Sequence, residues 1–513
     1  MRRFEPVLFG LLALLLYWLL GADAFYKVDG IDIVRLLQEH GEHPWHVGFL
    51  PALAGFARLL GMLGIEPDPL RLGALFSAFG AAIGVGFVRA GIDRLGPPPL
   101  GMTPAMARFT TAVFATCPIT LTFATVVEFH GPMLAPLGLA FWWTCVQLRQ
   151  PSFRGMALLG ALCHLPFLLH SQQLFLPVWL LAFFVLKRGL TRKNVALAVT
   201  AGAVHAALLL VLPRVFPGFY GYWADLSAGF STEASIGRPQ SLDYTAEILV
   251  QEWIWPWLPF SLLVFLAPFR KALRPEFAAF LLGFLPYLYL SVRQLVHEPE
   301  FGAYMLPMVL PAAMLIGRRL GGHPAVWIML VFHFVMWGRG PREHLQEQWR
   351  IDESFAERVA ESAAGRSPFV LVGSHRELGS AYARLPLPEF LWVRPNATLP
   401  RAQATPQQFA GIEFYLRRLL QEDRAVLITE GALRSLDDPH GAMLAEKATL
   451  AVPENSELAG PLFADHLRAE FGIPCRADRA WPLVPRSRCV RTSRGGAGGG
   501  VSPRGEDWRI GTP

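Results

Sequence analysis

Apolar runs of bilayer length recur along the first two thirds of the chain. The first run, LFGLLALLLYWLLGA, leads into the polar stretch FYKVDGIDIVRLLQEHGEHPWHVG. A hydrocarbon core about 30 Å thick needs roughly 20 helical residues to cross it. The pattern predicts an α-helical polytopic membrane protein of about eleven spans, near 6–22, 70–90, 105–125, 131–148, 155–170, 172–187, 194–214, 250–268, 276–292, 303–317 and 324–338.

One further apolar stretch, HVGFLPALAGFARLLGMLGI at 46–65, is read as an amphipathic helix lying at the membrane surface. A span here would place Arg58 near the bilayer centre, where a charge is costly. It would also invert the sidedness of every later loop. The alternative of a true span stays open.

Charged residues support this alternation. Only 17% of the 513 residues are charged and 53% are hydrophobic, against roughly 25% charged in soluble domains. With simple alternation the basic residues share one face, which the positive-inside rule makes cytoplasmic. They are Arg2, Arg3, Arg89, Arg94, Arg149, Arg154, Lys187, Arg188, Arg192, Lys193, Arg270, Lys271, Arg274, Arg318 and Arg319. The formal net charge of +6 therefore gives no reason to expect a nucleic-acid partner.

The pattern changes near residue 340, which predicts a membrane domain over 1–340. PFVLVGSHRELGSAYARL indicates strand, turn and helix, EFLWV a strand, and GIEFYLRRLLQEDRAVLITEG a helix and a strand. This alternation predicts a small extracytoplasmic α/β domain over 341–490. Cys475 and Cys489 fall in it, either disulfide-bonded or as two thiols. The glycine-rich tail, 491–513, is predicted to be disordered.

The opposite face carries acids and histidines. Asp29 and Asp32 follow the first span and share one side of a helical turn. Carboxylates in this place bind a divalent cation or act as a general base. The structural alternative is that Asp29 only caps the next helix. His43, before Pro44, ends that helix and is expected to face the same pocket.

Three later outer segments add candidates. TVVEFHGPM places Glu128 and His130 in a tight turn, either as site residues or as ordinary turn polarity. His170 lies at the outer end of its span and is expected to line the same cavity. SVRQLVHEPEF brings Arg293 and His297. The Arg293 guanidinium suits a phosphate, and the alternative is that it reaches lipid headgroups.

Four motifs, in this order, resemble the polytopic GT-C glycosyltransferase superfamily, and in particular its bacterial dolichyl- or polyprenyl-phosphate-mannose mannosyltransferase-like branch. The segment DGIDIVRLLQEHGEHPWHVGFLPALAG looks like the first outer loop of that family. ATVVEFHGPMLAPLGLAFW looks like its second acidic turn, and LLGALCHLPFLLHSQQLFLPVWLL like its next hairpin. EFGAYMLPMVLPAAMLIG looks like its late motif, which contains Tyr304. The family has a basic residue before this tyrosine, where this chain has Ala303.

The resemblance implies an inverting membrane glycosyltransferase that uses a polyprenyl-phosphate-linked sugar and a lipid, glycan or protein acceptor outside the bacterial inner membrane. Asp29 would be the general base. Glu128, with Asp32 or His130, would hold a metal ion or orient the donor phosphate. Asp29 and Glu128 are the expected ligands of Mg²⁺ or Mn²⁺, and no other cofactor is expected. His43, His130, His170, Arg293, His297 and Tyr304 would bind the donor phosphate or substrate.

Two other classes of function remain open. A transporter or flippase of lipid-linked or polar substrates would have charged or discontinuous helices at mid-membrane. A non-catalytic membrane anchor for the C-terminal domain would tolerate loss of the loop acids. The outer location of the ionisable residues favours the transferase.

Overall fold

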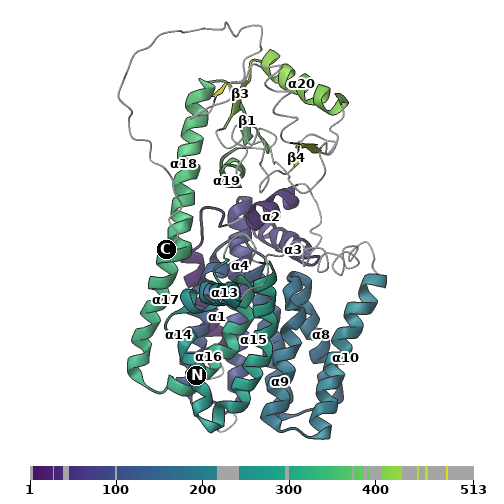
Figure 1. Ribbon diagram of the computed structural model, residues 1–513, viewed down its shortest axis with the longest axis vertical. Helices are drawn as coiled ribbons and strands as arrows, with labels where there is room; N and C mark the ends of the chain where they lie inside the picture. Colours follow the sequence, from purple (N-terminus) through teal and green to yellow (C-terminus); the bar gives the residue numbers. More distant parts are fainter. Residues whose placement is uncertain are drawn as a thin grey trace. The chain divides into compact units, whose positions relative to one another are not determined.

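The computed structural model describes residues 4–26, 28–38, 46–98, 101–215, 242–294, 300–372, 375–385, 390–392, 406–429, 447–449, 457–459 and 481–482. The chain divides into two compact units. The first comprises Met1–Glu357 and His375–Leu387, and the second Arg358–Ser374 and Pro388–Pro513. The helical class with a small sheet, predicted from the sequence, is confirmed, with most of the helices in the first unit (Figure 1).

The first half of the helical unit is a series of helices joined by short connections. Its elements are α1 (Glu5–Leu19), α2 (Val28–Gln38), α3 (Phe49–Met62), α4 (Pro69–Leu95), α5 (Pro104–Thr116), α6 (Pro118–Thr125), α7 (His130–Arg149), α8 (Phe153–Leu169), the 3₁₀ turn η2 (Ser171–Phe175), α9 (Leu176–Arg188) and α10 (Arg192–Val215).

The second half is more broken, because prolines and short 3₁₀ or π turns interrupt it. Its elements are α13 (Leu242–Leu249), the π-helix η4 (Val250–Ile254), η5 (Trp255–Trp257), α14 (Phe260–Leu263), η6 (Val264–Phe269), η7 (Lys271–Leu273), α15 (Arg274–Gln294), η8 (Ala303–Met305), α16 (Leu306–Leu320), η9 (Pro324–Met329), α17 (Leu330–Trp337), η10 (Gly338–Arg342), α18 (Glu343–Ala363) and α19 (His375–Arg384).

Three described helices are long and apolar enough to cross a membrane: Pro69–Leu95, Arg192–Val215 and Lys271–Val292. A fourth candidate is the pair Thr245–Trp257 and Phe260–Phe269, which is bent by 109°. Other expected spans are shorter or divided, as where Pro118 separates α5 from α6. The count of about eleven spans therefore stays a prediction.

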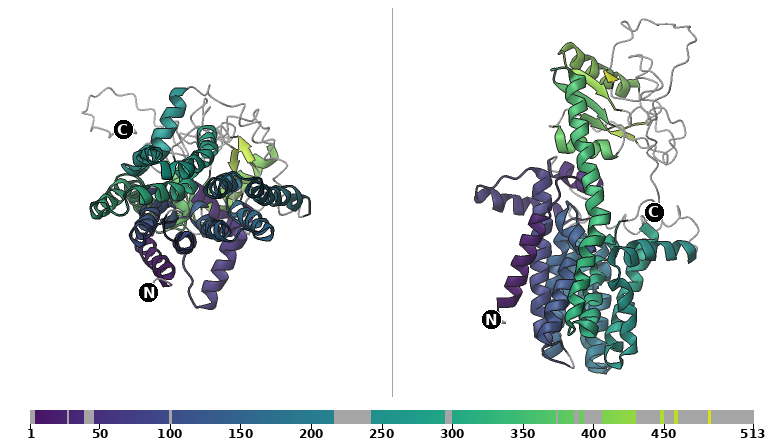
Figure 2. Two further views of the ribbon diagram at one scale, coloured as in Figure 1. Left: turned by 90° about the horizontal axis from the view of Figure 1, so that it is seen from below. Right: turned by 90° about the vertical axis from the view of Figure 1, so that its left-hand side faces the viewer.

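The α3 helix supports the interfacial interpretation of 46–65. It has 14 residues, which at 1.5 Å per residue gives about 21 Å. It runs across the long helices rather than along them (Figure 2). Its buried residues are Phe49, Leu50 and Leu53, whereas Arg58 and Met62 are exposed.

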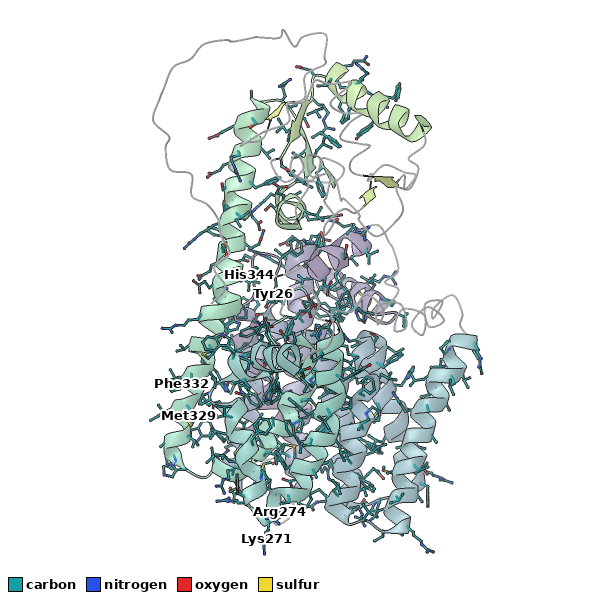
Figure 3. The ribbon with its side chains drawn as sticks, viewed as in Figure 1. Tyr26, Lys271, Arg274, Met329, Phe332 and His344 are labelled. Atoms are coloured by element: carbon teal, nitrogen blue, oxygen red, sulfur yellow. The ribbon has the colours of Figure 1, made fainter. Side chains whose placement is uncertain are left out.

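Basic side chains gather at one end of the helices, as the alternation predicts. Arg149 donates to the carbonyl of Leu95, and Arg188 donates to the carbonyl of Leu148. Glu276, at the start of α15, pairs with Lys187 at the end of α9 and with Arg318 at the end of α16. The labelled Lys271 and Arg274 lie at this end in Figure 3. Five helix ends named in the sequence as basic hairpins therefore belong together.

Close backbone contact between α4 and α7 depends on glycine. Gly80 and Gly84 are spaced four residues apart on α4, so they share one face. A Cβ on Gly80 would lie 2.4 Å from Pro132 Cα, and one on Gly84 would lie 2.4 Å from the Leu134 carbonyl oxygen. Such small-residue contacts are a common way for membrane helices to pack. This contact fixes the beginning of α7.

We expect Gly84→Ala to lower the free energy of unfolding by about 1–3 kcal/mol, because the new methyl group overpacks the contact. The thermal unfolding midpoint of the detergent-purified protein measures this. Gly55→Ala in α3 is the matched control, because a Cβ there meets no atom within 4 Å. An equal loss in both variants would contradict the packing argument.

The second unit contains a six-stranded sheet of order β5-β4-β2-β1-β3-β6. Its strands are β1 (Pro368–Val372), β2 (Phe390–Trp392), β3 (Ala425–Ile428), β4 (Lys447–Thr449), β5 (Glu457–Ala459) and β6 (Trp481–Pro482). The central β1 is parallel to β2 and β3, in register Val370 with Phe390 and with Leu427, and the outer pairings are antiparallel.

The strands and helices predicted after residue 366 are present, with α20 at Pro406–Gln421 preceding β3. Residues 369–372 of β1 are fully buried, as expected of a central strand covered on both faces. Cys475, Cys489 and the tail 491–513 lie outside the described residues, so the disulfide and the disorder stay predictions.

Candidate active site at one end of the helices

The turn between α6 and α7, residues 126–129, is completely buried. Glu128 is 3% exposed, and its Oε2 accepts the N–H of Phe129 at 3.0 Å. The same oxygen lies 3.4 Å from His130 Nδ1. When the Glu128 carboxylate is ionised it only accepts hydrogen bonds, and His130 then carries its proton on Nδ1 in this contact. Glu128 therefore orients the imidazole of His130.

Three imidazoles lie in a row beside this turn. The ring centroids of His130 and His170 are 4.3 Å apart, and those of His170 and His46 are 4.4 Å apart. His170 Nδ1 accepts the N–H of Gln172 at 3.3 Å. His46 Nδ1 accepts the N–H of Ser171 at 3.4 Å. Two rings are thus fixed by η2, while the buried Nε2 of His130 has no hydrogen-bond partner among the described residues.

Helix α2 brings Asp29 to this turn. Gly30 packs so closely that a Cβ there would lie 2.7 Å from the carbonyl oxygen of Val127. Asp29 is exposed and lies inside the first turn of α2, which begins at Val28, so it is not the N-cap residue considered from the sequence. Its carboxylate lies within electrostatic reach of His130. Asp32 forms an ion pair with Arg35 at 3.2 Å.

Tyr304, in η8, completes the cluster. Its ring is 6.4 Å from that of His130 in an edge-to-face arrangement. The carboxylates of Glu300, Asp29 and Glu128 all interact electrostatically with its hydroxyl group. Three parts of the chain that are far apart in the sequence therefore meet at one place. They are α2, the α6–α7 turn and the segment before α16.

Helices α18 and α19 also contact the chain at α2 and just before it. His344 Nε2 lies 3.1 Å from the carbonyl oxygen of Tyr26, and the two rings face each other edge to face (Figure 3). Asp352 is fully buried and accepts from Ser380 Oγ at 2.6 Å and from Gln348 Nε2 at 2.8 Å. Burial raises the pKa of the Asp352 carboxyl, and the two hydrogen bonds oppose that rise.

The structure thus brings together Asp29, Glu128, His130, His170 and Tyr304, all chosen from the sequence. It pairs Asp32 with a neighbouring arginine instead. His43, His297 and the side chain of Arg293 lie outside the described part.

Sequence reasoning missed three residues of this region: His46, Glu252 and Glu300. His46 follows the His43-Pro44 step in the same short segment, so the signal was available there. Glu252 lies in a run of tryptophans and prolines, WIWPW, and nothing near it in the sequence marks it as a site residue.

The donor set does not fit the expected metal ion. Among the described residues, no group of three or more histidine, cysteine, aspartate or glutamate side chains could hold one. The Glu128 oxygen nearest His130 already accepts a backbone N–H. Asp29 and Glu128 as metal ligands stay a prediction, and no step below depends on an ion.

A separate cavity of about 620 Å³ lies between α1 and α4. Tyr17, Asp23, Asp68 and Arg71 are among its lining residues. Arg71 pairs with both acids, at 3.7 and 3.5 Å. None of the site residues chosen from the sequence lines this cavity.

No protein-family model and no curated protein matches the chain. Among solved structures, it is similar to ArnT from Cupriavidus metallidurans bound to undecaprenyl phosphate, with 12% identity and a TM-score of 0.49 over 88% of this chain and 96% of that one. It is also similar to the Archaeoglobus fulgidus oligosaccharyltransferase tethered to an acceptor peptide containing the NVT sequon. That similarity has 11% identity and a TM-score of 0.44 over 84% of this chain and 70% of that one. Neither similarity identifies the activity of this chain.

Proposed function

We propose that the protein is a multi-pass membrane glycosyltransferase, which moves a sugar from a polyprenyl-phosphate-linked donor to an acceptor on the extracytoplasmic face of a bacterial inner membrane. One observation carries the proposal. The carboxylates of Asp29 and Glu128 meet His130 and Tyr304 at one end of the helices, whereas the basic hairpins meet at the other. That is the sidedness a membrane-bound donor with an outer reaction site requires.

Asp29 is the general base of this reaction. It is exposed, so a substrate hydroxyl can reach it, and an ionised carboxylate accepts the hydroxyl proton. The freed oxygen attacks the anomeric carbon as the bond from that carbon to the phosphate oxygen breaks. The polyprenyl phosphate leaves with the bonding electrons, and the attack from the opposite side inverts the anomeric centre.

His130 binds the substrate under the control of Glu128. With its proton held on Nδ1, the neutral imidazole presents a bare Nε2 that accepts a hydrogen bond from a sugar hydroxyl. The protonated imidazole would instead donate to a phosphate oxygen. The ring of His170 packs against that of His130, tilted by 42°, and keeps it in place. Arg293, near the end of α15, is the proposed partner of the donor phosphate.

Sugar transfer by the full-length protein in liposomes, with a polyprenyl-phosphate-sugar donor, tests the proposal. We expect Glu128→Gln to lower turnover about 10–100-fold, the range found when a carboxylate that orients a metal-ligating histidine is lost. Glu343→Gln removes an exposed carboxylate of α18 and should keep full activity. Measuring the wild type with Mg²⁺, with Mn²⁺ and with a chelator shows whether Glu128 acts through an ion. Equal activity of Glu128→Gln and the wild type would contradict its role.

Transport is the second candidate function, because the pair Thr245–Trp257 and Phe260–Phe269 is bent by 109°. Broken helices of this kind form substrate sites in transporters. The same liposomes distinguish the two functions. A transporter would carry the labelled donor across the membrane without cleaving it, whereas a transferase would release polyprenyl phosphate.

A further inference from the structure

The bent helix pair Thr245–Trp257 and Phe260–Phe269 contains a buried carboxylate that is hydrogen-bonded to the turn before Tyr304. Glu252, in the π-helix η4, is 0% exposed. Its Oε1 accepts the N–H of Glu300 at 2.7 Å, and its Oε2 accepts the N–H of Gly302 at 2.8 Å. Hydrogen bonds to an ionised group are about twice as strong as neutral ones. Both oxygens of one carboxylate are thus used to hold one turn.

The turn held by Glu252, residues 300–302, has a strained backbone. Phe301 has a φ of 51°, which is uncommon for a bulky residue, and Gly302 follows with a φ of 86°. A Cβ on Gly302 would lie 2.6 Å from Ile119 Cδ1 and 2.9 Å from the Glu252 carbonyl oxygen. Strain of this kind persists only where the surroundings enforce it, and it gathers at functional sites. A π-helix at the same place is a second mark of function.

The Glu300 carbonyl oxygen accepts the N–H of Ala303 at 3.2 Å in the turn that leads to Tyr304, whose ring is 6.4 Å from that of His130. The Glu300 carboxylate interacts electrostatically with His130 and with Tyr304, and Asp29 interacts with the same two residues. Two carboxylates from distant parts of the sequence therefore act on one imidazole and one phenol.

We propose that Glu300 is a further substrate-binding residue, which accepts hydrogen bonds from hydroxyl groups of the sugar, and that Glu252 is the positioning residue that holds Glu300 and Tyr304 against His130. This deepens the proposed function and rests on it for the identity of the ligand. The arrangement also explains why a buried charge is kept in a tryptophan-rich segment. An apolar residue at 252 could not satisfy the two backbone N–H groups.

Hydrogen–deuterium exchange of the detergent-purified protein tests the hydrogen bonds of Glu252 without any assay of activity. In the wild type the amides of Glu300 and Gly302 should exchange slowly. In Glu252→Gln the single remaining acceptor oxygen can hold only one of them, so the segment 300–305 should exchange about 10-fold faster. Glu247→Gln is the matched control, because this exposed acid on α13 bonds only to the Gln251 side chain among the described contacts. Unchanged exchange in Glu252→Gln would overturn the positioning role.

Transfer kinetics test the role of Glu300. Glu300→Gln keeps the backbone N–H, so exchange at 300–302 should stay slow while KM rises about 10-fold. Glu252→Gln should raise KM as well, and Glu252→Gln/Glu300→Gln should be no worse than Glu252→Gln alone, since both remove the same contact. An unchanged KM in Glu300→Gln would overturn its binding role. Absence of transfer by the wild type would contradict the proposed function. The exchange experiment would still show whether Glu252 holds residues 300–302.

Discussion

Replacing Asp29 with asparagine is expected to lower sugar transfer by about 10²–10⁴-fold, the range a general base contributes. Asparagine has nearly the same shape but cannot take up the proton of the acceptor hydroxyl. The loss should appear in kcat with little change in KM, because substrate binding rests on other groups. Steady-state sugar transfer in liposomes, over a range of acceptor concentrations, measures both quantities.

The control for this prediction lies six residues upstream. Asp23 is also an exposed carboxylate, and it pairs with Arg71 beside the separate cavity. Asp23→Asn should retain transfer within about twofold, because surface ion pairs contribute little. Near-normal turnover by a correctly folded Asp29→Asn protein would remove Asp29 as the base. An equal loss in both variants would point to a general effect of charge at this end of the helices.

The sequence predicted the two ends of the helical unit from charge alone. Helix alternation fixes which loops share a side, and lysine and arginine mark one of them. Arg149, Arg188 and Arg318 do lie together, and Asp29, Glu128 and His170 do lie near one another at the other end. Placing the segment 46–65 at the surface was necessary for this result, because a span there would have exchanged the ends of all later helices.

Contacts between segments far apart in the chain could not be predicted from the sequence. The hydrogen bonds from residues 300–302 to Glu252 join positions about 50 residues apart. They depend on a π-helix that no hydrophobic pattern indicates. The contact between the rings of His46 and His170 depends on where α3 begins. Helix α19 belongs by its contacts to the helical unit, since Ile31 of α2 packs against Gly379, although its pattern suggested only the α/β domain. Tertiary packing, and not the local sequence pattern, determines which unit such a helix joins.

The basic end of the helices contains the prediction with the largest expected effect on stability. Glu276 Oε1 pairs with both Lys187 and Arg318, and the three side chains are 4%, 7% and 9% exposed. Glu276→Gln leaves two buried cations without their counter-charge. Breaking a buried ion pair in this way costs about 3–5 kcal/mol, so the thermal unfolding midpoint in detergent should fall sharply.

Two comparisons separate this cost from a simple loss of surface charge. Lys271→Gln removes an exposed charge at the same end and should change stability by less than about 0.5 kcal/mol. The triple variant Glu276→Leu/Lys187→Met/Arg318→Met removes every charge of the cluster and should recover most of the stability, because apolar side chains of similar volume can replace a buried ion cluster. If the triple variant were as unstable as Glu276→Gln, the attraction among the charges, rather than the burial of unpaired cations, would be what ties α9, α15 and α16 together. Since this cluster lies at the opposite end from Asp29, the folded fraction of Glu276→Gln should keep the wild-type KM.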